Sequence, residues 1–245
     1  MQSTTRMRSA IIALSVAMAM AFTVTLAGCV ASVPEGQDAT SSPRPGPTGG
    51  TTAIPVAPSA QQKYDAVTQI IVRPEMLELK DVSGADVATM SYGATADEFG
   101  EAFTALLGAA PTITEFPGGT ESQPETRYVW EGFQLADDHE RGDYQDAMNV
   151  AVTFSAPALG PRGITVSTVQ GFKPGDDLRW LATYMDEPFD EASDFHQIQA
   201  EHGDPIGEQS AHSEYSNSNS VTGQTGYPDK TSVIFAPWNF GIGHV

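Results

Sequence analysis

The chain has 245 residues, 40% of them hydrophobic, so it is long enough to bury one sizeable core or two small ones. Twelve Lys and Arg stand against 31 Asp and Glu, which gives a formal net charge of −19. The phosphates of nucleic acids and anionic lipid headgroups repel a protein this acidic, so we expect no nucleic-acid partner. Cationic partners, metal ions and neutral ligands remain compatible with the charge, and the excess acid also keeps a surface protein soluble.

The N-terminal segment has the pattern of an export signal. Residues 1–9 contain two arginines and no acid, and residues 10–28 carry no charge. A basic start followed by an apolar run is typical of a secretory signal peptide, although about 20 apolar residues would also span a bilayer. The way the run ends, at Leu26, Ala27, Gly28 and Cys29, favours the signal peptide.

The sequence Leu-Ala-Gly-Cys resembles the lipobox of bacterial lipoproteins, in which a peptidase cuts just before the cysteine and the thiol carries a diacylglyceryl group. The resemblance implies that residues 1–28 are a removed signal peptide. It also implies that Cys29 is the lipid attachment site, with fatty acids such as palmitate. The two acyl chains of such a lipid anchor a protein stably to a membrane. We therefore expect a lipid-anchored protein on the extracytoplasmic face of the cell membrane, with no other cofactor.

Cys29 is also the only cysteine of the chain. The rest of the protein therefore contains no disulfide, no cysteine-ligated zinc and no thiol nucleophile. The residues just after it, 30–58, include six prolines and four glycines and show no helical or strand periodicity. This composition predicts a disordered or polyproline-like tether over 29–58, which would span roughly 30 Å as a coil and about 90 Å when fully extended.

The remaining residues, 59–245, alternate between helical and strand patterns and predict one folded domain. A capping box at Thr95 and Glu98 marks the start of the clearest helix, which Gly108 and Pro111 end. The expected helices are 60–72, 95–107, 176–186 and 191–202; the expected strands are 76–82, 87–92, 127–135, 148–154, 163–172 and 230–238, with a long loop at 207–229.

An internal similarity suggests two related halves. Residues 87–111 align without gaps on residues 166–188, and each stretch reads as strand, turn, capped helix and proline. We therefore expect an α+β fold in which an antiparallel sheet and packed helices form possible halves 75–138 and 148–245. Chance similarity between two amphipathic helices is the alternative.

The order of elements loosely resembles that of outer-membrane-assembly lipoproteins and β-lactamase-inhibitor-like modules. A closer likeness is to uncharacterised actinobacterial surface lipoproteins, across the lipobox and the stretches RPEMLELKD and TRYVWEGFQLADD. Neither resemblance implies a chemistry or transfers site residues.

Motifs for catalysis are missing from the sequence. It contains no Gly-x-Ser-x-Gly, no Ser-x-x-Lys and no P-loop. The acidic loop 137–146 offers oxygen ligands of the kind that calcium takes, but not at EF-hand spacing, and solvated acid is the simpler interpretation. His139, His196, His202 and His212 lack zinc-site spacing. A pair of carboxylates brought together in space stays open, because the sequence does not show such pairing.

The clearest candidate binding residues are Trp180 and Tyr184, four residues apart on a helix whose apolar face is already filled. The default expectation is that the 204–230 loop covers them; if exposed, they favour protein or glycan binding. Trp130 and Trp238 are expected in the core. The sequence thus favours a non-catalytic domain that binds a protein or small-molecule ligand, with a cell-envelope hydrolase using spatially assembled carboxylates as the alternative.

Overall fold

The computed structural model describes residues 60–119, 124–137, 148–209, 215–226 and 229–240. These residues all belong to one compact unit, Ile54–Val245. Cys29, the signal peptide, the tether and most of the acidic loop 137–146 lie outside the described residues. Within them, no helix has the length and apolar character needed to cross a membrane.

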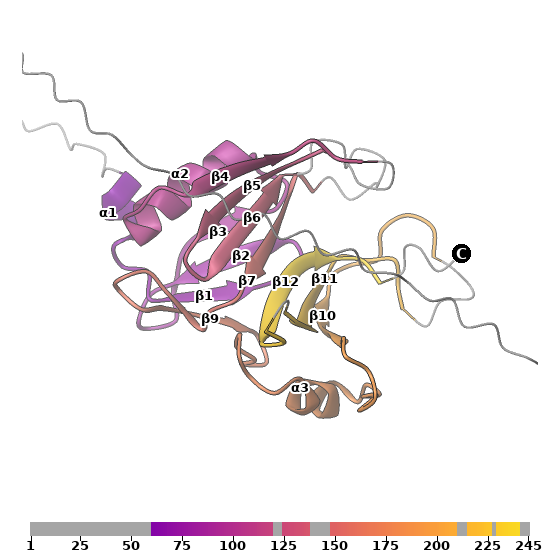
Figure 1. Ribbon diagram of the computed structural model, residues 1–245. Helices are drawn as coiled ribbons and strands as arrows, with labels where there is room; N and C mark the ends of the chain where they lie inside the picture. Colours follow the sequence, from indigo (N-terminus) through magenta and orange to yellow (C-terminus); the bar gives the residue numbers. More distant parts are fainter. Residues whose placement is uncertain (1–59, 120–123, 138–147, 210–214, 227–228, 241–245) are drawn as a thin grey trace, which may run out of the picture. The chain divides into compact units, whose positions relative to one another are not determined.

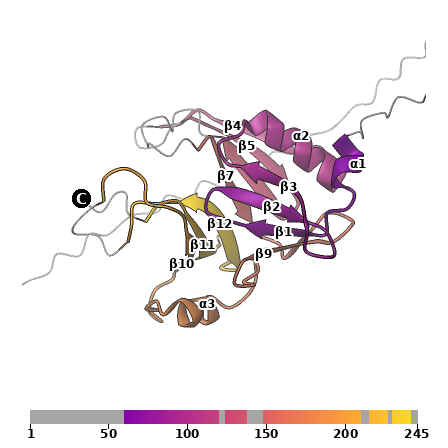
Figure 2. The ribbon, with the colours of Figure 1, turned by 180° about the vertical axis from the view of Figure 1, so that it is seen from behind.

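A five-stranded sheet contains the first strands of the chain (Figure 2). Its spatial order is β3-β2-β1-β9-β8, and its pairs are antiparallel except for β1 and β9, which are parallel. The strands are β1 (Gln69–Val72), β2 (Met76–Lys80), β3 (Asp86–Ser91), β8 (Ala158–Leu159) and β9 (Ile164–Thr168).

A seven-stranded sheet carries the rest of the β structure and faces the viewer in Figure 1. Its order is β10-β11-β12-β7-β6-β5-β4, and each neighbouring pair is antiparallel. The strands are β4 (Thr112–Phe116), β5 (Glu125–Trp130), β6 (Phe133–Asp137), β7 (Val150–Phe154), β10 (Gln197–His202), β11 (Ser220–Thr225) and β12 (Ser232–Trp238).

Three helices accompany the sheets: α1 (Ala60–Tyr64), α2 (Ala96–Leu107) and α3 (Leu178–Met185). The predicted capping box opens α2, since the Thr95 side chain accepts from the Glu98 N–H and the Glu98 carboxylate accepts from the Thr95 N–H. Gly108, at a φ of 69°, ends the helix in the left-handed conformation that glycine tolerates. Arg162 donates to the carbonyls of Tyr64 and Leu106 and so satisfies the ends of α1 and α2.

The core contains a run of aromatic rings between α2 and the seven-stranded sheet. Phe99 stacks on Phe103, Phe103 on Phe133, and Phe133 on Phe154, with centroid separations of 6.3, 4.0 and 4.8 Å. All four rings are buried. Aromatic pairs at such separations add to the stabilisation that comes from the buried apolar area. Trp130 joins this core as predicted, and its indole N–H donates to the Ala109 carbonyl at 2.8 Å.

The α+β prediction needs correction, because the described residues are mostly β structure in two sheets with few helices. The strands form two sheets, not the expected single sheet, and their pairing is antiparallel as expected except between β1 and β9. Both sheets take strands from both proposed halves: β2 and β3 share the five-stranded sheet with β8 and β9, and β6 pairs with β7 in the seven-stranded sheet. The residues between these strands therefore fold as one unit.

Two predicted helices contain strands in their C-terminal parts, although residues 60–64 of the first are helical as expected. Residues 69–72 of the expected helix 60–72 form β1, because Ile70, Ile71 and Val72 are β-branched and buried between β2 and β9. The expected helix 191–202 contains β10, in which Ile198 and Ala200 alternate with more exposed neighbours and face the core.

Two further boundaries differ from the prediction. The expected strand 127–135 is a hairpin, β5 and β6, whose turn Gly132 makes possible with a φ of 78°. The expected loop 207–229 includes β11, a strand with the polar sequence SVTGQT. The sequence analysis also missed β4, whose five residues are all exposed.

Candidate functional site

The two predicted binding residues, Trp180 and Tyr184, are exposed on α3, with 44% and 61% of their surface accessible. The expectation that a loop covers them is therefore wrong. Trp180 stacks on the buried ring of Phe172 at 6.1 Å with an interplanar angle of 7°, and Tyr184 lies 5.8 Å from Trp180. We call these three rings the α3 aromatic stack. Because the buried ring of Phe172 packs against Trp180, the stack presents a fixed surface to solvent.

The opposite face of α3 explains why its aromatic side chains point outward. Leu178 and Leu181 are buried against β11, directly over Gly223. A Cβ at Gly223 would lie 2.6 Å from Leu181, 3.0 Å from Leu178 and 3.0 Å from Phe172. Such distances leave no room for a side chain, so this glycine lets the helix approach the sheet.

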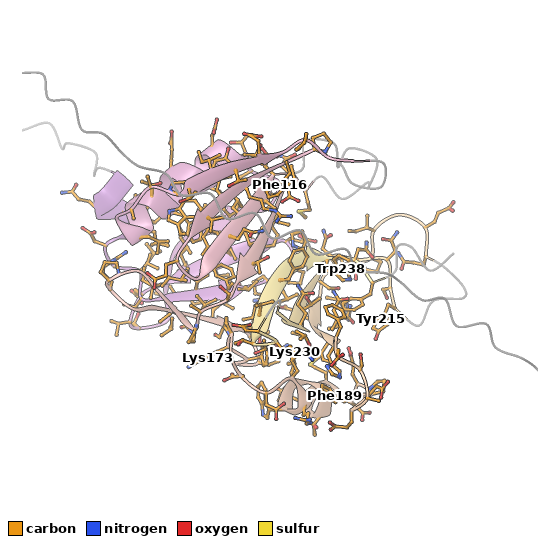
Figure 3. The ribbon with its side chains drawn as sticks, viewed as in Figure 1. Phe116, Lys173, Phe189, Tyr215, Lys230 and Trp238 are labelled. Atoms are coloured by element: carbon orange, nitrogen blue, oxygen red, sulfur yellow. The ribbon has the colours of Figure 1, made fainter. Side chains whose placement is uncertain are left out.

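A cavity of about 400 Å³, which we call the α3 pocket, opens at the start of this helix. Its walls come from the first turn of α3, from residues 189–196 and from residues 229–232, with Phe189 and Lys230 close to α3 (Figure 3). Phe189 stacks on His196 at 4.0 Å, and the Arg179 guanidinium lies 5.3 Å from the Phe189 ring. The charged side chains lining the pocket are Asp176, Asp177, Arg179, Glu191, Asp194, Asp229 and Lys230.

Both basic side chains of the α3 pocket form ion pairs. Arg179 donates Nε to Oε1 of Glu191 at 2.7 Å and Nη2 to Oε2 at 2.6 Å, a bidentate pair. These bonds raise the pKa of Arg179 and lower the pKa of Glu191. Lys230 donates to Asp194 at 2.6 Å, and this bond lowers the pKa of Asp194.

Backbone N–H groups engage the other three carboxylates. Asp176 accepts from the N–H of Lys173 at 2.8 Å, Asp177 caps α3 by accepting from the N–H of Arg179 at 2.9 Å, and Asp229 accepts from the N–H of Thr231 at 3.0 Å. Each carboxylate of the pocket is thus already an acceptor in a hydrogen bond within the protein, and these bonds hold the walls of the pocket in place.

A second cavity, also of about 400 Å³, lies on the face of the seven-stranded sheet that points away from α2. We call it the sheet groove. The residues that line it are uncharged, and six of them come from strand positions on, or continuing, the outer face: Val129, Gln134, Thr153, Ser155, Gln224 and Val233. The sequence did not predict the groove, because residues 127–135 read as one strand and β11 as part of a loop. Gly132, at a φ of 78°, was the available signal for the turn that divides β5 from β6.

A half-buried network of polar side chains connects the two sheets, and its role is structural. Arg73, just after β1, donates to Glu78 of β2 at 2.9 Å and to Glu201 of β10 at 2.7 Å. Burial raises the pKa of Glu201 despite the opposing effect of Arg73, and burial raises the pKa of Tyr92 well above its usual range. Because these groups bridge β2 and β10, we assign them to holding the sheets together.

Metal binding has no support within the described ranges, where no three His, Cys, Asp or Glu side chains are placed to hold an ion. No protein-family model matches the chain, and neither a curated protein nor a solved structure is significantly similar to it. The functional argument therefore rests on the residues and their geometry.

Proposed function

We propose that this chain is a membrane-anchored extracytoplasmic lipoprotein whose folded domain binds a protein or small-molecule ligand without catalysis. The anchoring part of the proposal rests on the order of the N-terminal residues. An arginine-containing start, an uncharged run and Leu-Ala-Gly-Cys follow one another, and a Pro- and Gly-rich tether comes next. The lipid on Cys29 would hold the domain at the membrane while the tether gives it reach.

One observation supports binding above the others, namely the exposure of the α3 aromatic stack. Large aromatic side chains are costly to expose to water, and they are enriched where proteins bind partners. Trp180 and Tyr184 lie side by side on a helix that Gly223 and its contacts fix to the sheet. The surface is therefore organised before a ligand arrives, which reduces the entropy cost of binding.

The pocket beside α3 gives the hydrolase alternative little support. A glycosidase general acid needs a carboxyl whose pKa is raised, so that it carries a proton at working pH. In the α3 pocket the pKa values of Glu191 and Asp194 are both lowered, because Arg179 and Lys230 donate hydrogen bonds to these carboxylates. The pKa of Glu201 is raised, but this carboxyl belongs to the Arg73 network and lies outside the pocket.

The binding proposal is tested by photo-crosslinking in intact cells. Benzoylphenylalanine placed at position 184 keeps an aromatic ring in the stack and should give one dominant adduct. The matched control places it at position 82, which is 91% exposed in the turn between β2 and β3. Adding Trp180→Ala should reduce the adduct at least fivefold. Equal adducts from both positions, or none across growth conditions, would refute the proposal.

The anchoring proposal has a separate test. Cys29→Ala should abolish labelling by a radioactive or alkyne-tagged fatty acid, and should leave the protein unprocessed or release it from the membrane. Cys29→Ser is the conservative control, because it keeps the size of the residue but lacks the thiol. A cleaved Cys29→Ala protein that stays on the membrane would contradict a lipid anchor at this residue.

A further inference from the structure

The sheet groove has a property that is unusual for this chain. The protein carries 31 acids and a net charge of −19, yet each described residue that lines this cavity of about 400 Å³ is uncharged. Pockets of this volume lie within the range that takes small ligands. A ligand that depends on charge would find no partner in the groove, whereas a neutral ligand would meet no opposing charge there.

The strand register shows how the floor of the groove is built. Val129 of β5 lies opposite Gln134 of β6, Gln134 opposite Thr153 of β7, and Thr153 opposite Phe235 of β12. Directly opposed residues in antiparallel strands point to the same face, so these four side chains form one row across the sheet. The next row contains Val233, which lies opposite Gln224. Because the row crosses four paired strands, its geometry is fixed.

Polar side chains in the groove keep hydrogen-bond donors and acceptors that are available to a ligand. Within the described part of the chain, the Gln134 amide and the Thr153 hydroxyl make no hydrogen bond. The Gln224 side chain accepts from Gln197 through Oε1 at 3.4 Å and keeps its own NH₂ group available. An amide offers both donors and an acceptor, and a hydroxyl offers one donor and two lone pairs. This set matches a ligand that carries many hydroxyl groups.

An exposed aromatic side chain lies on the same face of the sheet, beyond the residues that line the groove. Trp238, which was expected in the core, is 41% exposed and contacts Phe235 edge-on at a centroid distance of 5.8 Å. Figure 3 places Trp238 at the opposite end of β12 from Lys230. A bulge between Ser220 and Thr222 pairs Ser220 with Trp238, which brings the indole to the same face as Phe235. Sugar rings present apolar C–H faces, and an exposed indole offers a matching surface.

We infer that the sheet groove binds a neutral oligosaccharide. The inference rests on the proposed function and specifies one ligand class for that domain. An extended peptide would need a free strand edge for its backbone, but the groove lies over β6 and β7, which are hydrogen-bonded on both sides. An acidic polysaccharide would be repelled by the net charge, and a cation would find no carboxylate among the six outer-face residues.

The test uses the full chain, purified in detergent, and isothermal titration calorimetry. The probes are the neutral hexasaccharides of glucose (β1→4 and α1→4), mannose and N-acetylglucosamine, together with acidic hexagalacturonate and an uncharged Ser-Gly hexapeptide. At least one neutral hexasaccharide should bind, with an affinity that stays constant within twofold between 50 and 500 mM salt, because no ion pair contributes. Hexagalacturonate and the peptide should bind at least tenfold more weakly.

Matched variants locate the site. Gln134→Leu and Thr153→Val keep the side-chain volume but remove the free polar groups, and each should weaken binding of the hexasaccharide at least tenfold. Val82→Ser changes a side chain that is 91% exposed in the turn between β2 and β3, away from both cavities, and should leave that affinity unchanged. Unfolding curves for all three variants check that the fold is retained. Loss of affinity in Val82→Ser alone, or tighter binding of the peptide or of hexagalacturonate, would overturn the inference.

Failure of the inference and failure of the proposed function are distinguishable. If no neutral hexasaccharide binds, the glycan inference is wrong, while crosslinking at position 184 still decides whether the domain binds a partner. If a hexasaccharide binds and is hydrolysed, as thin-layer chromatography of the mixture would show, the glycan inference stands and the non-catalytic proposal is wrong. Binding without hydrolysis supports both.

Discussion

The α3 pocket and the sheet groove have the same volume, about 400 Å³ each, but opposite chemistry. The pocket is lined by five acids and two bases, and its walls come mainly from loops and the first turn of a helix. The described residues that line the groove are uncharged, and its floor consists of paired strands. In the pocket the polar groups are already bound to one another, whereas in the groove Gln134 and Thr153 keep their hydrogen-bonding capacity for a ligand.

The difference shows that charge by itself is a poor guide to a binding site in an acidic protein. The carboxylates beside α3 position loops: Asp194 fixes Lys230, and Glu191 fixes Arg179. Exposed pairs of this kind contribute little to stability, because both partners are solvated. In the groove, the Gln134 amide and the Thr153 hydroxyl have no such bond among the described residues, so their available hydrogen-bonding groups are better evidence of a ligand.

The largest effect is expected where α3 meets the sheet. Gly223→Val would place a branched side chain where even a single Cβ would lie 2.6 Å from Leu181, so the leucine side chains or the helix must shift. We expect the free energy of unfolding to fall by about 2 kcal/mol, the usual range for an overpacked core. Urea unfolding followed by circular dichroism measures this change.

The same variant tests whether the two cavities are independent. Amide chemical shifts at Arg179 and Ser193 should change strongly, while those at Gln134 and Thr153 should change little. Comparable changes at both sites would show that the pocket and the groove act as one unit. Gly100→Ala is the control, because a Cβ at this helical position of α2 meets no atom within 4 Å. It should raise the free energy of unfolding by about 0.5–1 kcal/mol.

A smaller effect is expected when the pocket loses its bidentate ion pair. Arg179→Gln removes both bonds to Glu191 and the contact with Phe189, so the pKa of Glu191 should rise toward its ordinary value of 4.5. Carbon-13 NMR titration of the Glu191 carboxyl measures the change. Lys173→Gln makes the same change of charge at a residue with no ion pair among those described, and should leave that titration unaltered. A Glu191 pKa that does not move in Arg179→Gln would contradict the assignment.

Acidification should weaken the α3 pocket before it affects the sheet groove. Because the folded-state pKa values of Glu191 and Asp194 are lowered, their stabilising bonds are fully present above the ordinary pKa values of 4.5 and 3.8. The bonds are lost as the pH falls through the lowered values. The protection factors for hydrogen exchange at Ser193 and Lys230 should therefore fall on acidification before those at Gln134 and Thr153 do, since none of the described residues lining the groove is titratable. A simultaneous fall at both sites would contradict this difference.

The smallest effect on stability is expected in the groove itself. Thr153→Val removes a hydroxyl that bonds to none of the described residues, and valine suits a strand at least as well as threonine. The free energy of unfolding should change by less than about 0.5 kcal/mol. Thr126→Val is the contrasting control, because the buried Thr126 donates to Glu115 at 2.8 Å. This substitution should lower the free energy of unfolding by about 1 kcal/mol. Equal losses would show that Thr153 has a structural partner.

Local signals in the sequence predicted the parts of the fold that depend on local interactions. The helix 96–107 follows from its capping box at Thr95 and from the glycine at 108, and α3 follows from its apolar spacing and its proline and glycine before the start. The hairpin of β2 and β3 was found for the same reason, since strand alternation and a turn lie within one short stretch. These elements need no distant partner to be recognised.

The errors concern elements that distant partners decide. Residues 69–72 are equally apolar as a helix or a strand, and it is pairing with β9, far along the chain, that makes them β1. Likewise, β11 is polar and contains a glycine, and its strand structure comes from β10 and β12 on either side. Trp180 and Tyr184 could be named from the sequence as candidates, but whether a loop covers them depends on tertiary structure.

The parallel pair of β1 and β9 has a consequence for how the protein is made. Thr165 bonds to the Thr68 carbonyl across 97 residues of sequence, so the five-stranded sheet is incomplete until most of the chain has been synthesised. Contacts between residues so far apart slow folding, because a long loop must close first. For a chain that is exported through a membrane, as we propose, this delay would keep the emerging polypeptide unfolded during passage and postpone folding until the C-terminal strands have crossed.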